Sequence, residues 1–234
     1  MNITSMINET RANGGEVWIF SDIHLLKKGK DSPRIWSRDN VRDTFNQYLD
    51  KITEKDMIIF IGDFVDDCID TNLTKITFVK TFERLNENKN RVWIRGNNDM
   101  LPDAFLNNHG WKPCYSATAF IDKYLVFSHT SLDVSSMGIY NIHGHMHRND
   151  NSTMYYYHNP KGCVNIAPSC NLGHGFRLDE IMSMIDAHIW DQYEWYPGEE
   201  KPGMSRYICE QATAELDDDY LAEFYGKEKN NDNN

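Results

Sequence analysis

Short apolar runs separated by amphipathic segments follow one another along most of the chain. The runs are rich in β-branched and aromatic residues, a composition that is typical of buried strands. Five of them stand out, at residues 17–20, 57–61, 91–94, 124–127 and 140–142. Further strands are predicted around residues 115–121, 154–158 and 162–167.

Two helices are predicted between the first three strands. The first follows Ser37 and Asp39, and the second runs from about residue 73 to residue 85. Each has its apolar residues on one face, namely Val41, Phe45, Tyr48, Leu49 and Ile52 in the first and Ile76, Val79, Phe82 and Leu85 in the second. The alternation of strand and helix is typical of βαβ units with a parallel sheet. A further helix is predicted to start in the segment 176–185.

The composition divides the chain into four parts. Residues 1–15 form a polar N-terminal segment, and residues 16–190 contain all the predicted strands. Aromatic residues and then an acidic helical pattern follow Trp190, so we expect residues 191–225 to be an extension that packs on the main domain. Residues 226–234 are strongly polar, and we expect them to be disordered.

The net charge of the chain limits the kinds of molecule that it is expected to bind. The 234 residues carry 24 basic and 35 acidic side chains, a formal net charge of −11. An acidic surface disfavours non-specific binding to long nucleic acids, whereas a small phosphorylated molecule can still bind at a local positive site.

The five cysteines are odd in number and lack a C-x-x-C spacing, which indicates reduced thiols in a cytoplasmic protein. The N-terminus does not resemble a signal peptide and no apolar stretch could span a bilayer, so no membrane contact is expected.

A small polar cluster follows each of the five apolar runs. The clusters are S-D-I-H at 21–24, G-D-F-V-D-D at 62–67, R-G-N-N-D at 95–99, S-H-T at 128–130 and H-G-H-M-H at 143–147. In an open α/β sheet the ligand site lies at the carboxyl ends of the strands. A fold that aligns these strands therefore gathers Asp, His and Asn side chains on one rim.

These side chains suit metal ions that prefer oxygen and imidazole ligands, namely Mn, Fe, Zn, Co or Ni. No cysteine stands in the clusters, which argues against a structural zinc site. The clusters together offer more Asp, His and Asn side chains than one ion can bind, and they suit two ions that share a carboxylate. Two adjacent metals stabilise the attacking and leaving oxygens of an in-line displacement, as phosphate-ester hydrolysis requires. Each motif alone has a structural explanation; for example, G-D at the end of a strand is often only a turn. Five such motifs in order, each after an apolar run, are not explained in this way.

The order D-x-H, G-D-x-x-D, G-N-x-D, H, G-H-x-H resembles the calcineurin-like metallophosphoesterases, and among them the small bacterial and phage phosphoesterases. The resemblance spans residues 16–185 and implies a metallophosphoesterase domain over residues 16–190. It implies an α/β fold of two stacked mixed β-sheets flanked by helices, the αββα sandwich. It also implies a hydrolase whose nucleophile is a hydroxide held between two divalent transition metals, with Mn²⁺ preferred over Fe, Zn, Co or Ni.

The resemblance assigns roles to individual residues. One metal would be held by Asp22, His24, Asp63 and His147. The other would be held by Asp63, Asn97, His129 and His145, so that Asp63 bridges the two ions. Asp66 would orient a ligand. The predicted catalytic set is Asn98, Asp66 and Asp99, and the candidates for contact with a substrate phosphate are Arg148 and Asn98.

The third motif departs from the family pattern at one position. The usual motif is G-N-H-D or G-N-H-E, whose His is thought to protonate the leaving oxygen, whereas this chain has Asn98. Asparagine donates a hydrogen bond but cannot deliver a proton. General-acid help is typically worth a factor of about 10² to 10⁴, and its loss hurts most with a poor leaving group. Family branches without this His include phosphodiesterases and pyrophosphatases. We therefore predict a preference for diesters or pyrophosphates; the alternative is that Asn98 only weakens a general activity.

The sequence favours a metal-dependent phosphodiesterase that acts on a small or medium phosphorylated substrate. The alternatives are a nuclease of the same fold acting on short oligonucleotides, or a broad phosphomonoesterase. A third alternative, a non-catalytic scaffold, is disfavoured because scaffolds usually lose metal ligands and all seven expected positions are filled. The native metals, the physiological substrate and the oligomeric state, including a homo-oligomer, stay open.

Overall fold

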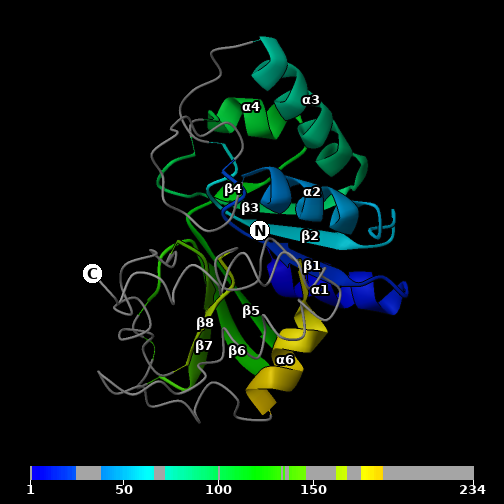
Figure 1. Ribbon diagram of the computed structural model, residues 1–234. Helices are drawn as coiled ribbons and strands as arrows, with labels where there is room; N and C mark the ends of the chain where they lie inside the picture. Colours follow the sequence, from blue (N-terminus) through cyan, green and yellow to red (C-terminus); the bar gives the residue numbers. More distant parts are fainter. Residues whose placement is uncertain are drawn as a thin grey trace, which may run out of the picture.

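The computed structural model describes residues 2–24, 38–65, 72–99, 101–132, 134, 137–145, 162–167 and 175–186. Its helices are α1 (Ile3–Ala12), α2 (Arg38–Leu49), α3 (Asn72–Glu87), α4 (Asp103–Asn108) and α6 (Leu178–Asp186). Its strands are β1 (Val17–Phe20), β2 (Met57–Ile61), β3 (Asn90–Ile94), β4 (Pro113–Cys114), β5 (Ser116–Ile121), β6 (Lys123–Ser128), β7 (Ile139–His143), β8 (Cys163–Asn165) and β9 (Phe176–Arg177). Figure 1 shows these elements in two sheets with helices around them.

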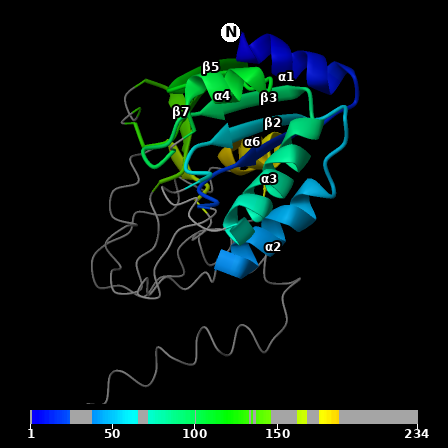
Figure 2. The same cartoon turned by 90° about the horizontal axis from the view of Figure 1, so that it is seen from above.

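The larger sheet has the strand order β4-β3-β2-β1-β9. Strands β1 to β4 run parallel, and β9 pairs with β1 in the antiparallel direction. The connections from β1 to β2 and from β2 to β3 carry α2 and α3, which lie side by side (Figure 2). Polar residues that follow β1, β2 and β3 therefore leave the sheet at the same edge.

The smaller sheet has the strand order β5-β6-β7-β8. Strands β5 and β6 form an antiparallel hairpin, whereas β6, β7 and β8 run parallel. Ser128 at the end of β6 lies opposite His143 at the end of β7. The loops that follow these two strands consequently begin side by side, and the Gly144 N–H donates to the His129 carbonyl at 3.1 Å.

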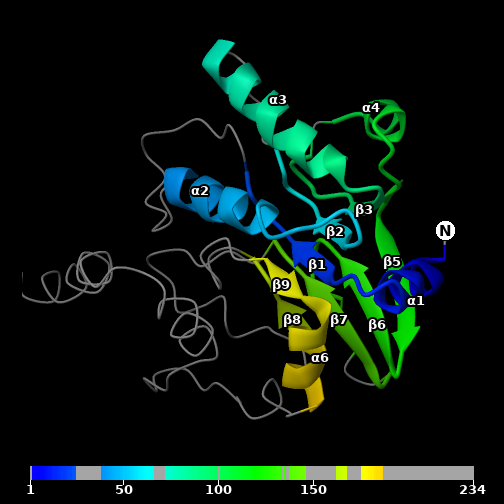
Figure 3. The same ribbon diagram turned by 90° about the vertical axis from the view of Figure 1, so that its right-hand side faces the viewer.

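Two hydrophobic cores cover opposite faces of the larger sheet. Consecutive residues of a strand point to opposite faces, so Ile59 of β2 joins Phe127 of the smaller sheet in one core. Phe60 points the other way and packs with Phe45 of α2 and Phe82 of α3. Figure 3 shows α2 and α3 on one side of the larger sheet and the smaller sheet on the other. The predicted fold class, two stacked mixed sheets flanked by helices, is confirmed.

Residues 1–15, predicted only as a polar segment, contain helix α1. Asn2 caps this helix because its side chain accepts a hydrogen bond from the Ser5 N–H at 3.1 Å. Ile3 and Ile7, one helical turn apart, are both buried in the core between the sheets. The helix escaped prediction because its buried side is short: it consists of Ile3, Ile7 and Thr10, with Met6 partly buried beside them.

The other predicted strands and helices within the described residues are confirmed, with one shift near the end. Val79, predicted on the apolar face of the second helix, is 45% exposed. Phe176 and Arg177, predicted to start a helix, instead pair with Ile19 and Trp18 of β1, and α6 begins at Leu178. The strand predicted around 154–158, the extension 191–225 and the tail 226–234 lie outside the described residues. In the part of the chain that the structure describes, no helix has the length and apolar character needed to cross a membrane.

Candidate metal centre

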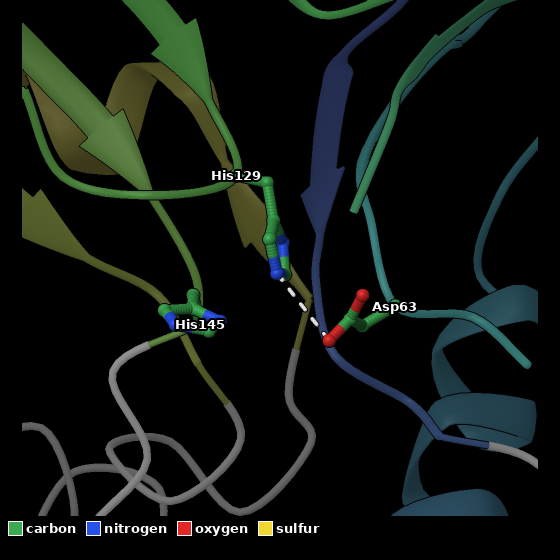
Figure 4. Close-up of side chains that lie close together, drawn as sticks. All are labelled: Asp63, His129 and His145. Atoms are coloured by element: carbon green, nitrogen blue, oxygen red, sulfur yellow. Dashed lines mark ion pairs between the residues drawn. The ribbon is translucent and has the colours of Figure 1, made fainter. Parts of the chain in front are cut away.

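The predicted ligands meet where the carboxyl ends of the two sheets come together. Asp63 follows β2 of the larger sheet, whereas His129 and His145 follow β6 and β7 of the smaller one (Figure 4). One ligand atom from each residue lies within 4.8 Å of the other two. Asp63 and His129 are buried and His145 is half-buried, so the protein shields most of this cluster from solvent.

A second cluster shares Asp63 with the first. Asp22, His24 and Asp63 are all buried, and their ligand atoms also lie within 4.8 Å of one another. His24 Nε2 is 3.6 Å from Asp22 Oδ1 and 3.7 Å from Asp63 Oδ2. Asp63 Oδ2 is also 3.3 Å from His129 Nε2. One carboxylate oxygen thus faces imidazoles of both clusters, as a ligand that bridges two ions must.

The backbone at the predicted ligands has an uncommon conformation. Among the described residues other than glycine, φ is positive at Asp22 (56°), His24 (46°), Asp63 (56°), His145 (63°) and Asp122 (74°). Four of these five residues are predicted metal ligands. Backbone strain of this kind costs of order 1–3 kcal/mol per residue and concentrates at functional sites. The fold therefore holds these side chains in place against local backbone preference.

Two glycines let the ligand loops approach one another. Gly96 lies against Asp63, and a methyl group at this position would collide with the Asp63 carboxylate. Gly144 lies against Ser21 and Asp22, and a methyl group there would collide with both side chains. The G-N-x-D and G-H-x-H motifs therefore need glycine for close packing of the loops.

Asp22 is oriented by a neighbour that the sequence did not single out. Asp22 Oδ2 accepts hydrogen bonds from the Ser21 hydroxyl and, at 2.9 Å, from the His145 N–H. The other oxygen, Oδ1, is the one that lies near His24. Ser21 Oγ is also 2.7 Å from the Ile61 carbonyl oxygen, so it links the ends of β1 and β2. The signal that the sequence offers for Ser21 is its place directly before the D-x-H motif.

The His129 ring is held from two sides. Its Nδ1 donates to the Ile61 carbonyl at 3.0 Å, which leaves Nε2 as the candidate nitrogen for binding a metal. This Nε2 lies 2.9 Å from Asn97 Oδ1. The predicted ligand oxygen of Asn97 therefore faces the same point as the imidazole.

His129 and Asp63 form a buried pair with coupled charges. Burial of the ring opposes its protonation, but the hydrogen bond to Asp63 and the charges of Asp22 and Asp63 outweigh it and raise the pKa of His129 to about 9. Burial likewise raises the pKa of Asp63, and the contact with His129 outweighs it, so that the pKa of Asp63 is lowered. The Asp63 carboxylate therefore stays ionised, and a metal ion that binds His129 must displace the proton from its ring.

Asn98 makes two hydrogen bonds to the shared carboxylate. Its backbone N–H donates to Asp63 Oδ1 at 2.8 Å, and its side-chain Nδ2 donates to Asp63 Oδ2 at 2.7 Å. Asn98 is half-buried, which leaves part of its side chain open to solvent. The structure thus brings Asn98 to the site, whereas its contact with a substrate stays a prediction.

Asp99 contacts both loops that carry Asp63 and Asn97. Its Oδ1 accepts from the Phe64 N–H at 3.0 Å, and its Oδ2 accepts from Trp93 Nε1 at 3.0 Å and from the Gly96 N–H at 2.8 Å. Burial raises the pKa of Asp99, and the three hydrogen bonds offset this only in part. Through these contacts Asp99 holds the two loops together. A direct part of Asp99 in catalysis stays a prediction.

The remaining site predictions fall outside the described residues. These are Asp66, His147 and Arg148, whose roles stay predictions. The donors that the structure does bring together are carboxylates, imidazoles and one amide oxygen, with no thiolate among them. This set fits divalent transition metals that prefer oxygen and nitrogen ligands.

Comparison with known proteins gives one family and one similar fold. The family model described as calcineurin-like phosphoesterase matches residues 15–222. No curated protein matches the chain. A structure of a protein of unknown function from Aquifex aeolicus is 16% identical and matches 73% of this chain and 99% of its own, with a TM-score of 0.56. This likeness shows the fold alone.

Two further solved structures match less of the chain. The nuclease MPE of Pseudomonas putida is 18% identical over 56% of this chain and 61% of its own, with a TM-score of 0.38. Vacuolar Protein Sorting 29 of Cryptosporidium parvum is 15% identical over 57% of this chain and 66% of its own, with a TM-score of 0.32.

Proposed function

Since the chain belongs to the calcineurin-like phosphoesterase family, we propose that it hydrolyses phosphodiester or pyrophosphate bonds of a small or medium phosphorylated substrate with the help of two divalent metal ions. The observation that carries the proposal is that Asp63 belongs to both ligand clusters. A structural metal site does not need two adjacent ligand groups around one carboxylate. An in-line displacement at phosphorus does, because charge develops on both the attacking and the leaving oxygen.

Each ion has its own set of ligands in this proposal. Asp22, His24, Asp63 and His147 would hold one ion, and Asp63, Asn97, His129 and His145 the other. Bound ions supply Lewis-acid polarisation of the phosphoryl group and an activated water. We propose Mn²⁺ as the native ion, and Fe, Zn, Co and Ni are the alternatives because they also bind oxygen and imidazole donors.

Charge at the site differs in sign from charge on the whole chain. Two divalent ions against the carboxylates of Asp22 and Asp63 give 4 − 2 = +2, whereas the chain carries −11. A compact phosphorylated substrate is therefore attracted to the site while a long nucleic acid is repelled by the surface.

Asn98 sets the preference among phosphate esters in this proposal. It stands where the family motif has a titratable His, and its Nδ2 donates to Asp63 Oδ2. An amide cannot protonate a departing oxygen. Substrates whose leaving group departs as a stable anion, such as a phosphate, are therefore favoured over alkyl monoesters.

A hydrolysis screen with Mn²⁺ tests the proposal. The substrates are monoesters, bis esters, cyclic nucleotides, nucleotide sugars and short oligonucleotides, and Asp63→Asn is the inactive control. We expect bis(p-nitrophenyl) phosphate or a nucleotide sugar to be cleaved faster than p-nitrophenyl phosphate. A much faster reaction with p-nitrophenyl phosphate would contradict the preference for diesters. No reaction with any substrate would contradict the enzymatic function and favour a scaffold.

A further inference from the structure

Asn141 is a fully buried polar side chain outside the ligand set. It lies on β7 with a relative exposure of 0%. Its Nδ2 donates to the Val126 carbonyl at 3.1 Å and to Ser128 Oγ at 2.8 Å, and its Oδ1 accepts from the Leu132 N–H at 2.7 Å. Both amide hydrogens and the amide oxygen are thus engaged within the described residues.

These hydrogen bonds close the turn that carries His129. Ser128 directly precedes His129, and Leu132 follows it by three residues, so Asn141 fastens the turn at both ends. Ser128 Oγ extends the contact by donating to the Thr130 carbonyl at 2.7 Å. The backbone on either side of His129 is therefore tied to β7 through one amide side chain.

Strand β7 supports the neighbouring ligand as well. The Gly144 N–H, just beyond the strand, donates to the His129 carbonyl at 3.1 Å. The next residue is His145, whose ring centre lies 5.0 Å from that of His129. Figure 4 shows the two rings on adjacent segments that face Asp63. The position of β7 relative to the turn thus fixes the spacing of two predicted ligands.

We propose that Asn141 is a positioning residue for the metal site of His129 and His145, an inference that rests on the proposed function. Asn141 neighbours the apolar cluster of Val126, Val134 and Cys163. Stability alone would favour an apolar side chain at this buried position, because burying an amide carries a desolvation cost. An apolar side chain would leave the Leu132 N–H without its acceptor and release the turn. Asn141 acts through the turn, because its side-chain hydrogen bonds go to Val126, Ser128 and Leu132 and to no predicted ligand.

A second buried asparagine provides the matched control. Asn88 has a relative exposure of 4% and precedes β3, at the end of the larger sheet opposite to the ligands. Its Nδ2 donates to the Thr53 carbonyl at 3.0 Å, and its Oδ1 accepts from the Asn90 N–H at 2.9 Å. Asn88→Leu therefore breaks buried amide hydrogen bonds of the same kind at a distance from the metal site.

Mn²⁺ binding to the full chain, measured by isothermal titration calorimetry, tests the inference. His24→Ala and His145→Ala each remove a ligand of one cluster and so identify the two binding steps. We expect Asn141→Leu to weaken the step of the His129–His145 site about 10-fold, as is typical for residues that orient metal ligands, and to spare the other step. Asn88→Leu should lower the melting temperature and leave both steps unchanged.

The outcomes separate the inference from the proposed function. A wild-type chain that binds no Mn²⁺ overturns both. If the wild type shows two binding steps and Asn141→Leu leaves both unchanged, the inference alone is overturned. The same holds if Asn88→Leu weakens the His129–His145 step as much as Asn141→Leu does. If Asn141→Leu does not fold, Ser128→Ala is used instead, because it removes only the hydroxyl that links Asn141 to the Thr130 carbonyl. This variant should weaken the same step and shift the visible d–d bands of Co²⁺ bound there, and an unchanged affinity and spectrum would overturn the inference.

Discussion

Replacing Asp99 by alanine tests how the loops after β2 and β3 are held together. Three N–H groups lose their acceptor in this variant, namely those of the Phe64 and Gly96 backbones and of the Trp93 indole. A buried donor left without a partner costs about 1–3 kcal/mol. Water that enters the vacated space restores part of this, so we expect a loss of about 3–5 kcal/mol. Domains are typically stable by about 5–15 kcal/mol, so the change is a large share of the total.

Urea unfolding followed by tryptophan fluorescence measures this loss. The experiment is done in EDTA, so that bound metal does not contribute to the free energy of unfolding. Asp103→Ala is the control, because Asp103 is an exposed carboxylate 3.4 Å from Arg95 Nε. An exposed ion pair contributes about 0–1 kcal/mol, and the control should stay in that range. An Asp99→Ala variant within about 1 kcal/mol of wild type would refute the role assigned to Asp99.

Further substitutions address the shared carboxylate and its neighbours. Asn98→His should raise kcat/KM for an alkyl monoester such as glycerol phosphate by about 10²-fold, and an unchanged value would argue against the leaving-group explanation. Gly96→Ala should displace the Asp63 carboxylate and abolish both Mn²⁺ binding steps with little change in far-UV circular dichroism; retained binding would contradict the close packing of these loops. In the metal-free protein the pKa of His129 is raised from 6.5 to about 9, so its contribution to stability is complete below pH 6.5 and is lost as the pH rises through about 9. Urea midpoints in EDTA should therefore fall over this range in wild type, and a similar fall in His129→Gln would show that another group is responsible.

The strands of the larger sheet could be predicted from sequence as short continuous apolar runs, and the two central helices from apolar residues at helical spacing. Runs such as MIIFI at 57–61 are buried on both faces of a parallel sheet, so no polar residue interrupts them. Helix α1 could not be predicted in the same way. Its buried side is short, formed by Ile3, Ile7 and Thr10 with Met6 partly buried, and the packing partners that stabilise it lie in strands far along the chain.

The clustering of the predicted ligands could be foreseen because Asp22, His24, Asp63, His129 and His145 each lie just after a strand, where the chain order fixes their place at the sheet edge. Their role as metal ligands stays a prediction. Asn141 and Ser21 could not be foreseen, because their roles depend on hydrogen bonds that no spacing rule encodes. Asn141 reaches Val126 and Leu132, which are distant in sequence and meet it only across the β6–β7 pairing. The orientation of Asp99 toward Phe64 and Trp93 likewise follows from the approach of two loops rather than from its motif.

The central claim is that one carboxylate, that of Asp63, serves two metal ions, and the number of ions per chain tests it most directly. Protein loaded with Mn²⁺ and dialysed is analysed by mass spectrometry of the metal for wild type, His24→Ala, His145→Ala and Asp63→Ala. A shared ligand predicts two ions in wild type, one in each histidine variant and close to none in Asp63→Ala. A single ion in wild type, or a full complement of one ion in Asp63→Ala, would contradict the claim.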